Sequence, residues 1–172
     1  MLAGAASFSA HAALVLNEPF DYDDGALITV SSGLWSTHSG TAGQVDVVGG
    51  KINLTFNLSE DVNAPLSGSP HTTGILYASF VVNFSALPNG NGTYFAHFKD
   101  TGTSNFRGRI FALTSGAGSG QFRLGIANAA GSASAVIEKD LSLNTDYLVV
   151  LRYNVTNYTS TLWINPGSES AT

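Results

Sequence analysis

Short runs in which apolar and polar residues alternate recur along nearly the whole chain. In residues 51–58, Ile52, Leu54, Phe56 and Leu58 alternate with polar neighbours. A period of two is typical of a β-strand with one buried face, so we expect these four side chains to face a core. By the same pattern we predict strands at 14–17, 27–30, 44–48, 51–58, 75–84, 93–99, 106–113, 121–126, 134–138, 146–155 and 160–164.

Turn-forming residues separate these runs, and no window has a sustained helical period. Clear examples are Gly49 and Gly50, the NGNG stretch at 89–92 and the SGAGSG stretch at 115–120. Many short strands with regular turns predict an all-β fold, a two-sheet antiparallel β-sandwich or jelly roll. We expect it to form a single domain over residues 13–172.

Alternation also predicts which side chains point inward. The expected core sides are Leu76, Ala78, Phe80, Val82 and Phe84 in 75–84; Tyr94, Ala96 and Phe98 in 93–99; Phe106, Gly108 and Ile110 in 106–113; and Tyr147, Val149, Leu151 and Tyr153 in 146–155. Five of the seven cationic residues then lie on the opposite faces: Lys99, Arg107, Arg109, Arg123 and Arg152.

Composition narrows the class of protein. Of the 172 residues, 44% are hydrophobic and only 11% are charged, so solubility depends on Ser, Thr, Asn and Gly, as in many extracellular β-proteins. The net charge of −5 disfavours a nucleic-acid partner. The absence of cysteine excludes disulfides and thiolate metal sites and fits bacterial export.

The first twelve residues are predicted to belong to export rather than to the fold. Residues 1–12 are small and uncharged, and Ala10, His11 and Ala12 form an A-x-A cleavage pattern, so we interpret them as a signal-peptide remnant. A secreted or cell-surface location follows. No later apolar run is long enough to span a bilayer.

Several stretches resemble the concanavalin A-like lectin/glucanase superfamily, specifically the LamG-like jelly-roll modules of secreted bacterial proteins. They are EPFDYDDGAL at 18–27, SEDVN at 59–63, YFAHFKD at 94–100, FRGRIF at 106–111, FRLGI at 122–126 and LWINP at 162–166. The resemblance implies a jelly roll whose last strand would lie beyond Thr172. We therefore expect an open sheet edge that could support self-association.

The motifs of an enzyme are mostly missing. Glucanases of that superfamily carry Glu-x-Asp-x-x-Glu, whereas here Glu138 and Asp140 supply only two of the acids. No G-x-S-x-G motif occurs, and the four histidines lack metal-ligand spacing. A hydrolase is thus disfavoured, while a polysaccharide lyase that uses His97, Arg109 and Tyr77 stays open. The alternative for His97 is a half-exposed strand residue with a purely structural role.

A structural calcium ion is the only cofactor that the sequence suggests. Asp21, Asp23 and Asp24 precede a glycine and could supply oxygen ligands. Glu60, Asp61 and Asn63 form a second candidate cluster. The alternative for the aspartates is a polar turn in which they cap backbone amides.

These observations predict a non-catalytic carbohydrate-binding or adhesion module, with an acidic polysaccharide as the ligand. The candidate residues for polar contacts are His97, Arg107, Arg109 and Arg123, and those for stacking are Tyr77 and Trp163. Because Arg107 and Arg109 are two residues apart, we expect them on one face. For Trp35, and as the alternative for Trp163, a packing role is the stronger interpretation.

Two alternatives stay open. The cations could instead pair with the twelve acidic residues and hold sheets and loops in register. The domain could also be a structural spacer or assembly module.

Overall fold

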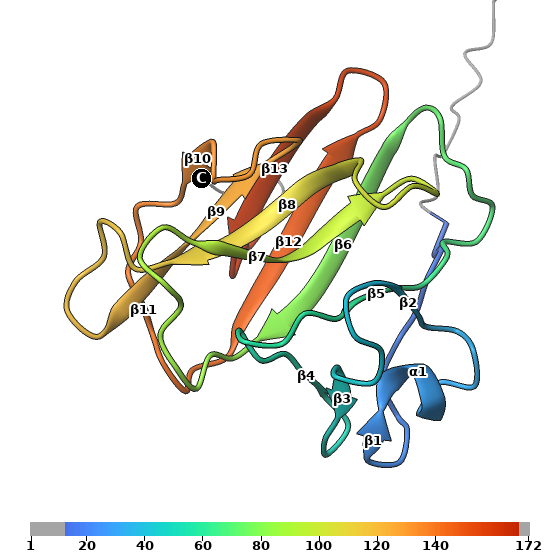
Figure 1. Cartoon of the computed structure of the whole chain (residues 1–172). Coiled ribbons are helices and arrows are strands. Elements are labelled where there is room, and N and C mark those ends of the chain that lie inside the picture. The colour runs from blue at the N-terminus through green and yellow to red at the C-terminus, as the bar shows by residue number, and fades with distance from the viewer. Residues whose placement is uncertain (1–12, 169–172) are drawn as a thin grey trace, which may run out of the picture.

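Two antiparallel β-sheets face each other and form the body of the protein (Figure 1). The computed structural model describes residues 13–168. The first sheet has the order β13-β12-β6, and the second has the order β10-β9-β8-β7 with β11 also paired to β9. Their bounds are β6 Ile75–Val82, β12 Tyr147–Asn154 and β13 Thr159–Ile164, then β7 Thr93–Lys99, β8 Phe106–Leu113, β9 Gln121–Ala127, β10 Ala135–Val136 and β11 Leu141–Ser142.

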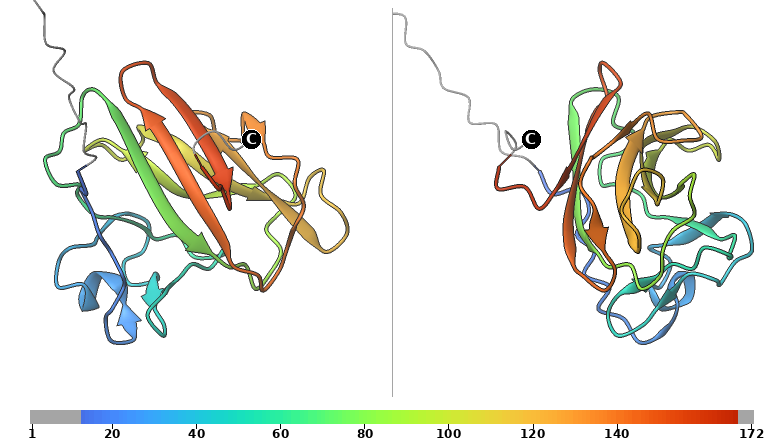
Figure 2. Two further views of the ribbon diagram at one scale, coloured as in Figure 1. Left: turned by 180° about the vertical axis from the view of Figure 1, so that it is seen from behind. Right: turned by 90° about the vertical axis from the view of Figure 1, so that its left-hand side faces the viewer.

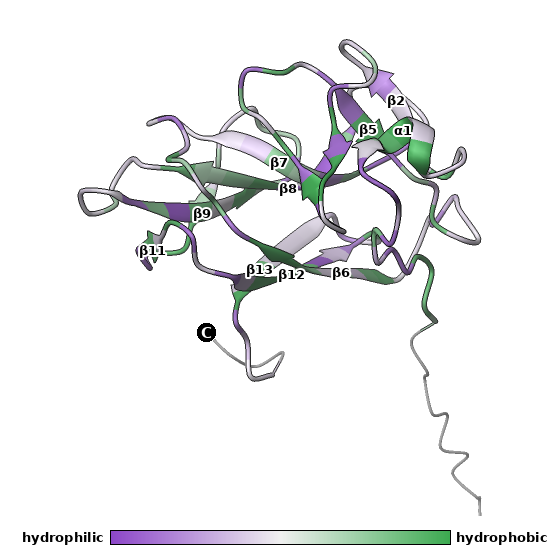
Figure 3. Ribbon diagram, turned by 90° about the horizontal axis from the view of Figure 1, so that it is seen from below, coloured by the Kyte–Doolittle hydropathy of each residue, from purple (hydrophilic) through white to green (hydrophobic). Residues whose placement is uncertain are grey.

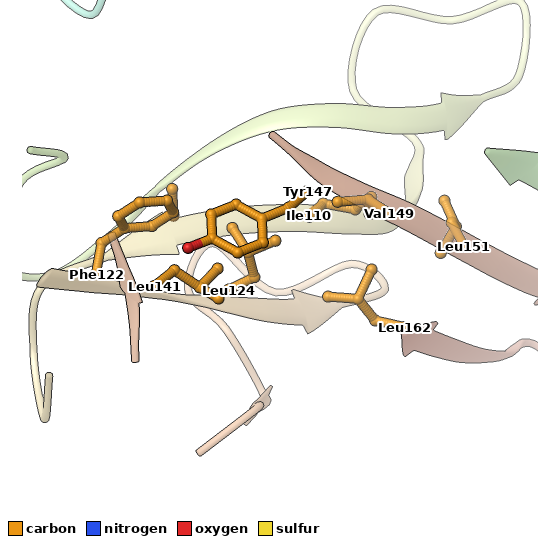
Figure 4. Close-up of a cluster of buried hydrophobic side chains, with 9 residues drawn as sticks. Ile110, Phe122, Leu124, Leu141, Tyr147, Val149, Leu151 and Leu162 are labelled. Carbon is orange, nitrogen blue, oxygen red and sulfur yellow. The ribbon is translucent and has the colours of Figure 1, made fainter. Parts of the chain in front are cut away.

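The main core lies between these two sheets, which the side view shows as two layers (Figure 2). Phe122, Leu124 and Ile110 come from the second sheet, and Val149 and Leu151 come from the first (Figure 4). All five are buried, with at most 2% of their surface exposed. Removal of these apolar side chains from water holds the two sheets together.

The prediction of an antiparallel all-β fold is confirmed. The predicted strands 93–99 and 106–113 coincide with β7 and β8, and the predictions for β6, β9, β12 and β13 err by at most two residues at either end. The inward sets of 75–84 and 146–155 are confirmed too, because burial alternates along β6 and β12 with the predicted phase. The sequence did not predict β11 or the short strands β1, β2 and β5.

The strand prediction for 27–30 is wrong, because these residues form the helix α1, Leu27–Val30. The backbone N–H of Ser31 donates to the carbonyl of Leu27 at 3.0 Å and closes the turn. A short run with three apolar residues among four fits a helical turn as well as a strand. Residues 14–17, also predicted as a strand, have no regular secondary structure.

The prediction for 51–58 is also wrong beyond its first residues. Only β4, Ile52–Asn53, is a strand, and the N–H of Leu58 donates to the carbonyl of Thr55 at 3.0 Å in a turn. Leu54, Phe56 and Leu58 are 50%, 61% and 45% exposed, respectively. Alternation indicates which residues could share a face, but burial requires a second layer over that face, and the fold supplies none here.

The N-terminal elements gather at one end of the sandwich (Figure 1). β1 (Gly25–Ala26), β3 (Asp46–Val47) and β4 form a small sheet, and β2 (Ser36–Ser39) pairs with β5 (Asp61–Asn63). Leu27, Val45 and Val47 form a separate small core beside α1. Seen from below, α1, β2 and β5 lie on the side of the β7–β8 layer (Figure 3).

Two glutamates organise this N-terminal region. Glu60 is 8% exposed, and its carboxylate accepts hydrogen bonds from the backbone N–H groups of Gly43 (3.0 Å), Gln44 (2.6 Å) and Val45 (2.7 Å) and from the Thr37 hydroxyl. Burial alone would raise the pKa of Glu60, but these hydrogen bonds lower it below its usual value. The ionised carboxylate therefore holds residues 43–45 against β2.

Glu18 likewise holds neighbouring side chains in place by accepting hydrogen bonds, here around Trp35. Its carboxylate accepts hydrogen bonds from Nε1 of Trp35 and from the Tyr22 hydroxyl, both at 2.8 Å. The Trp35 ring also packs against Phe20, with 5.9 Å between the ring centroids. The packing role expected for Trp35 is confirmed.

The predicted signal-peptide remnant, residues 1–12, lies outside the described residues. Within residues 13–168, no helix has the length and apolar character needed to cross a bilayer.

We expect Glu60→Gln to lower the free energy of unfolding by about 2 kcal/mol, because it removes a buried charge that accepts several hydrogen bonds. Urea denaturation at neutral pH measures this change. Glu138→Gln, at an exposed position, is the matched control and should change stability little. Equal stability of the two variants would contradict the structural role of Glu60.

Candidate functional site

A cluster of aromatic and cationic side chains lies where β2 meets the outer face of β7 and β8. We call it the histidine–arginine cluster, and it consists of His38, Tyr94, His97, Phe106 and Arg109. The His97 and Phe106 rings are stacked with 4.2 Å between centroids. The His38 ring meets His97 edge-on at 6.1 Å and Phe106 at 5.9 Å. The cluster thus joins the N-terminal elements to the sandwich.

Arg109 is held by the rings of this cluster. Its guanidinium carbon lies 4.8 Å from the Tyr94 ring centroid and 4.6 Å from the Phe106 ring centroid. A guanidinium over an aromatic face is attracted by the ring quadrupole. Nη1 of Arg109 also donates to the carbonyl of Ala130 at 3.1 Å. The rings and this carbonyl orient the cation.

Register shifts between β7 and β8 bring these side chains together. Phe98 pairs with Arg107 and Ala96 pairs with Ile110, so β8 has one extra residue between these pairs, as in a β-bulge. Gly108 lies in this interval with φ of +58°, a conformation that favours glycine. The bulge lets Phe106 and Arg109 share a face although they are three residues apart.

The alternation predicted for β7 and the start of β8 is therefore corrected. Tyr94 and Phe106, expected in the main core, lie in the histidine–arginine cluster, whereas Phe95 packs against the main core together with Ala96 and Phe98. The second register shift, between Tyr94 and Ala96, accounts for the position of Tyr94. Side-chain alternation fails wherever one strand gains a residue that its partner lacks.

Burial keeps His97 uncharged at neutral pH. Burial lowers the pKa of His97 to about 4, with smaller lowering effects from His38 and Arg109 and opposing effects from the Phe98 carbonyl and Asp61. The pKa of His38 is lowered by burial and by Lys99, against Asp61. Both rings are therefore neutral near pH 7, and each carries one donor and one acceptor nitrogen.

Tyr94 also stays in its neutral form. Burial and the charge of Asp61 raise the pKa of Tyr94, while Arg109 opposes them. Its hydroxyl is therefore protonated near pH 7 and able to donate a hydrogen bond.

The cluster contains buried polar atoms without a hydrogen-bond partner in the protein. They are both ring nitrogens of His38 and Nε of Arg109. Leaving such a group unpaired costs about 1–3 kcal/mol, so each one in a native structure calls for an explanation. His38, Tyr94, His97 and Arg109 are half-buried rather than fully buried, so parts of these side chains border solvent, although the unpartnered nitrogens themselves are buried.

A surface depression of about 390 Å³ lies beside the segment to which Arg109 donates its hydrogen bond. It is lined by the end of β9 and the segment after it, including Ala130, whose carbonyl accepts the Arg109 hydrogen bond, and by Ser160 of β13. Asn128 and Ser134 add amide and hydroxyl groups to the lining. The volume is at the lower end of the range of ligand pockets.

The other predicted arginines make different contacts. Nε of Arg123 lies 2.6 Å from Oδ1 of Asp140 in a salt bridge, and the Arg123 hydrogen bond lowers the pKa of Asp140. Nη1 of Arg107 donates to the Phe106 carbonyl at 2.8 Å. The structure thus brings His97 and Arg109 together, but it places Arg107 and Arg123 outside their cluster. The expectation that Arg107 and Arg109 share a face is wrong, because the bulge at Gly108 pairs Arg107 with Phe98, which packs against the main core. For Arg123, the pairing alternative describes what is observed.

Tyr77 and Trp163 belong to the other sheet. Tyr77 on β6 pairs with Arg152 on β12, and Trp163 on β13 pairs with Val150 on β12. Because the neighbouring residues Val149 and Leu151 are buried in the core, Val150 and Arg152 point outward, and so do their partners. Tyr77 and Trp163 therefore lie on the opposite outer face of the sandwich from His97 and Arg109.

The structure also places the candidate calcium ligands. Glu60 is saturated by the hydrogen bonds described above, Asp61 accepts one from the Ser39 hydroxyl at 2.5 Å, and Asp24 accepts one from the N–H of Gly49 at 2.7 Å. Over residues 13–168, no group of three or more His, Asp or Glu side chains could hold a metal ion. The calcium prediction gains no support from this arrangement.

Sequence reasoning missed three members of the cluster: His38, Tyr94 and Phe106. No spacing motif marks His38, which lies outside every strand that the sequence predicts. The alternating pattern placed Tyr94 and Phe106 on the wrong side, because a bulge leaves no trace in the polarity of the strand apart from Gly108.

No family model matches this chain, and a search of curated proteins found no similar sequence. The fold class, an antiparallel two-layer β-sandwich, therefore rests on the sheet topology alone. The resemblance to concanavalin A-like modules stays a prediction.

We expect the free energy of unfolding to fall by about 2 kcal/mol between about pH 7 and about pH 5 through His97 alone. The pKa of His97 is about 4 in the folded protein, against an ordinary value of 6.5. Its stabilising effect is therefore complete above pH 6.5 and is lost as the pH falls toward 4. Urea denaturation at the two pH values measures the difference.

His97→Phe keeps a ring against Phe106 and removes the titration, so its stability should depend less on pH; His38 would account for the remaining dependence. The control is His71→Phe, since His71 lies in a loop where its Nε2 is 3.1 Å from the Ser67 carbonyl. An unchanged pH profile in His97→Phe would show that His97 is not the titrating group.

Proposed function

We propose that this protein is a non-catalytic carbohydrate-binding module that binds acidic polysaccharide at the histidine–arginine cluster. Secretion or attachment to the cell surface, with residues 1–12 as the signal-peptide remnant, belongs to the same proposal. So does the assignment of the sandwich to the concanavalin A-like jelly rolls. The supporting observation is Arg109, a cation that is oriented by two aromatic rings and that donates to Ala130, a residue in the lining of a surface depression.

The geometry around Arg109 suits a sugar that carries a carboxylate or sulfate. A guanidinium forms strong, directional hydrogen bonds to such groups. One face of Arg109 is covered by rings, its Nη1 is used by Ala130, and its Nε is unpartnered. Because Nε is buried, an anionic oxygen would have to contact Nη2, the remaining nitrogen of the guanidinium.

The neutral histidines and Tyr94 suit sugar hydroxyls. A hydroxyl both donates and accepts, as do the neutral histidine rings and the Tyr94 phenol. The two unpartnered ring nitrogens of His38 are buried, so the first contact of a sugar hydroxyl would be with Tyr94. The half-buried Tyr94 offers a ring edge and a phenolic hydroxyl next to Arg109. Because the chain carries a net charge of −5, attraction to an acidic polymer must be local, and salt should weaken it.

A polysaccharide lyase is the second candidate function. The lyase hypothesis named His97, Arg109 and Tyr77, and the structure places Tyr94 rather than Tyr77 beside the other two, with 5.6 Å between the Tyr94 and His97 ring centroids. A neutral histidine could accept a proton while Arg109 neutralises a uronate carboxylate. Release of unsaturated oligosaccharides from alginate or pectate would favour this candidate over simple binding.

We expect Arg109→Gln to weaken binding of alginate, pectate or a sulfated galactan roughly 10- to 100-fold, because a charge-assisted hydrogen bond is lost. Isothermal titration calorimetry at low salt measures the affinity, with dextran as the neutral polymer.

Arg107→Gln is the matched control for this experiment. It removes the same charge two residues away on β8, from a side chain outside the cluster, so its affinity should stay near that of the wild type. Equal losses in both variants would reflect net charge alone and would contradict the site assignment. Self-association without binding of any of these polymers would instead favour the structural spacer.

A further inference from the structure

We infer that acid releases the N-terminal elements from the sandwich: protonation of His38 and His97 separates β2 from β7, while the two-sheet body stays folded. We call residues 20–63 the N-terminal unit. The inference goes beyond the proposed function and does not depend on it, because no ligand takes part. It describes an acid-sensitive junction that is built into the fold.

The N-terminal unit and the sandwich have separate cores. The small core beside α1 and the apolar side chains packed against it come from residues 20–62, whereas the main core is formed by residues between 78 and 164. Each part therefore removes its own apolar groups from water, and separating the two parts leaves both cores intact. Such a part can open at a lower free energy than the whole molecule needs to unfold.

His38 links the two parts. It lies on β2, and its ring meets the rings of His97 on β7 and Phe106 on β8 at 6.1 and 5.9 Å between centroids, respectively. Seen from below, β2 lies on the side of the β7–β8 layer (Figure 3). These are edge-on contacts between uncharged rings. A charged imidazolium would lose its hydration in such a buried contact, which is costly unless the charge is paired.

The surroundings of His38 offer nothing to a second ring proton. Over the described part of the chain, both ring nitrogens of His38 are buried and have no hydrogen-bond partner. A neutral ring has one N–H group, whereas a protonated ring has two and carries a full charge. Protonated His38 would therefore bury two unpaired donors as long as β2 stays docked. Undocking gives both nitrogens access to water, so protonation favours the undocked state.

The charged groups that face the two rings add to this effect. Lys99 of β7 disfavours a charge on His38, while His38 and Arg109 of β8 disfavour a charge on His97. Asp61 of β5 acts in the opposite direction on both rings. Protonation would place two more positive charges beside the two cations and the carboxylate. Repulsion between like charges therefore pushes the two parts away from each other.

Burial determines the pH range of the response. Burial lowers the pKa of His97 to about 4 and also lowers the pKa of His38, both from an ordinary value of 6.5. In the undocked state water reaches both rings, so the pKa of each returns toward 6.5. The advantage of the docked state is therefore complete above pH 6.5 and is lost as the pH falls toward 4. Through His97 alone, the ratio of undocked to docked protein rises about 20-fold between about pH 7 and about pH 5.

The carboxylates that hold the N-terminal unit together keep their charge in this range. Against the effect of burial, hydrogen bonds lower the pKa of Glu60 and that of Glu18 below the ordinary value of 4.5. Tyr94, whose ring centroid is 5.6 Å from that of His97, stays neutral because burial raises its pKa. Mild acid therefore acts on the junction and leaves the interior of the N-terminal unit unchanged.

Two spin labels, one on each part, test the inference. Because the sequence has no cysteine, Phe56→Cys and Val81→Cys provide the only thiols, and both positions are 61% exposed. Double electron–electron resonance measures the distance between the labels. We expect the ratio of a second, displaced population to the docked one to rise about 20-fold or more between about pH 7 and about pH 5. Far-UV circular dichroism should stay unchanged, because both cores persist.

His38→Phe/His97→Phe in the labelled protein keeps the ring contacts and removes both titrations, so the docked distance should persist at both pH values. Urea denaturation establishes that this variant is folded. His97→Phe alone is the second variant and should lose the part of the response that His97 supplies. The matched control is His71→Phe, because His71 lies in a loop, with its Nε2 3.1 Å from the Ser67 carbonyl. It should respond to acid as the labelled wild type does.

Three results would overturn the inference. The first is an unchanged distance distribution in the labelled wild type at the lower pH. The second is an acid response that persists in folded His38→Phe/His97→Phe, since the two rings would then not be the groups that titrate. The third is a loss of β-structure that accompanies the change in distance, since acid would then unfold the sandwich rather than open the junction. None of these results bears on polysaccharide binding at neutral pH.

Discussion

Burial of apolar side chains between the two sheets is the interaction on which the rest of the structure depends. Phe122, Leu124 and Ile110 on one side and Val149 and Leu151 on the other are almost completely removed from water. Because strand side chains alternate, burying one set sends the other set outward. This single constraint determines which residues of β6, β12 and β13 point outward, and it separates the two outer faces by a solid core.

The histidine–arginine cluster arises where that constraint is interrupted. Without the shift around Gly108, Phe106 would point into the main core and Arg109 would lack one of the rings that hold it. The shift near Tyr94 supplies the second ring. Bulges often re-aim side chains next to functional sites, and here two of them gather a cation, a phenol and an imidazole on one half-buried surface. His38 completes the cluster from a distant part of the sequence.

The N-terminal region is organised by polar interactions more than by its small core. Glu60 and Glu18 are ionised groups whose hydrogen bonds replace the regular ladders that short strands such as β1, β3 and β4 cannot provide. Glu60 holds the loop before β3 against β2, and β2 carries His38 to His97 and Phe106. The geometry of the candidate site therefore depends on carboxylates that never touch it, and this explains why a residue first considered as a calcium ligand has a structural role.

The amino-acid sequence by itself determined the fold class, most of the long strands and the outward direction of Arg109, Arg152, Tyr77 and Trp163, since a period of two follows directly from backbone geometry and the removal of apolar groups from water. Only the tertiary structure decided which outward residues are neighbours. Tyr77 and Trp163 lie on a different sheet from His97 and Arg109, and Arg123 forms a salt bridge with Asp140. Residues 27–30 form a helix, and Phe56 is exposed. The physical reason is that sheet order, register shifts and the burial of a short apolar run depend on contacts between residues far apart in the chain, and local polarity carries no record of them.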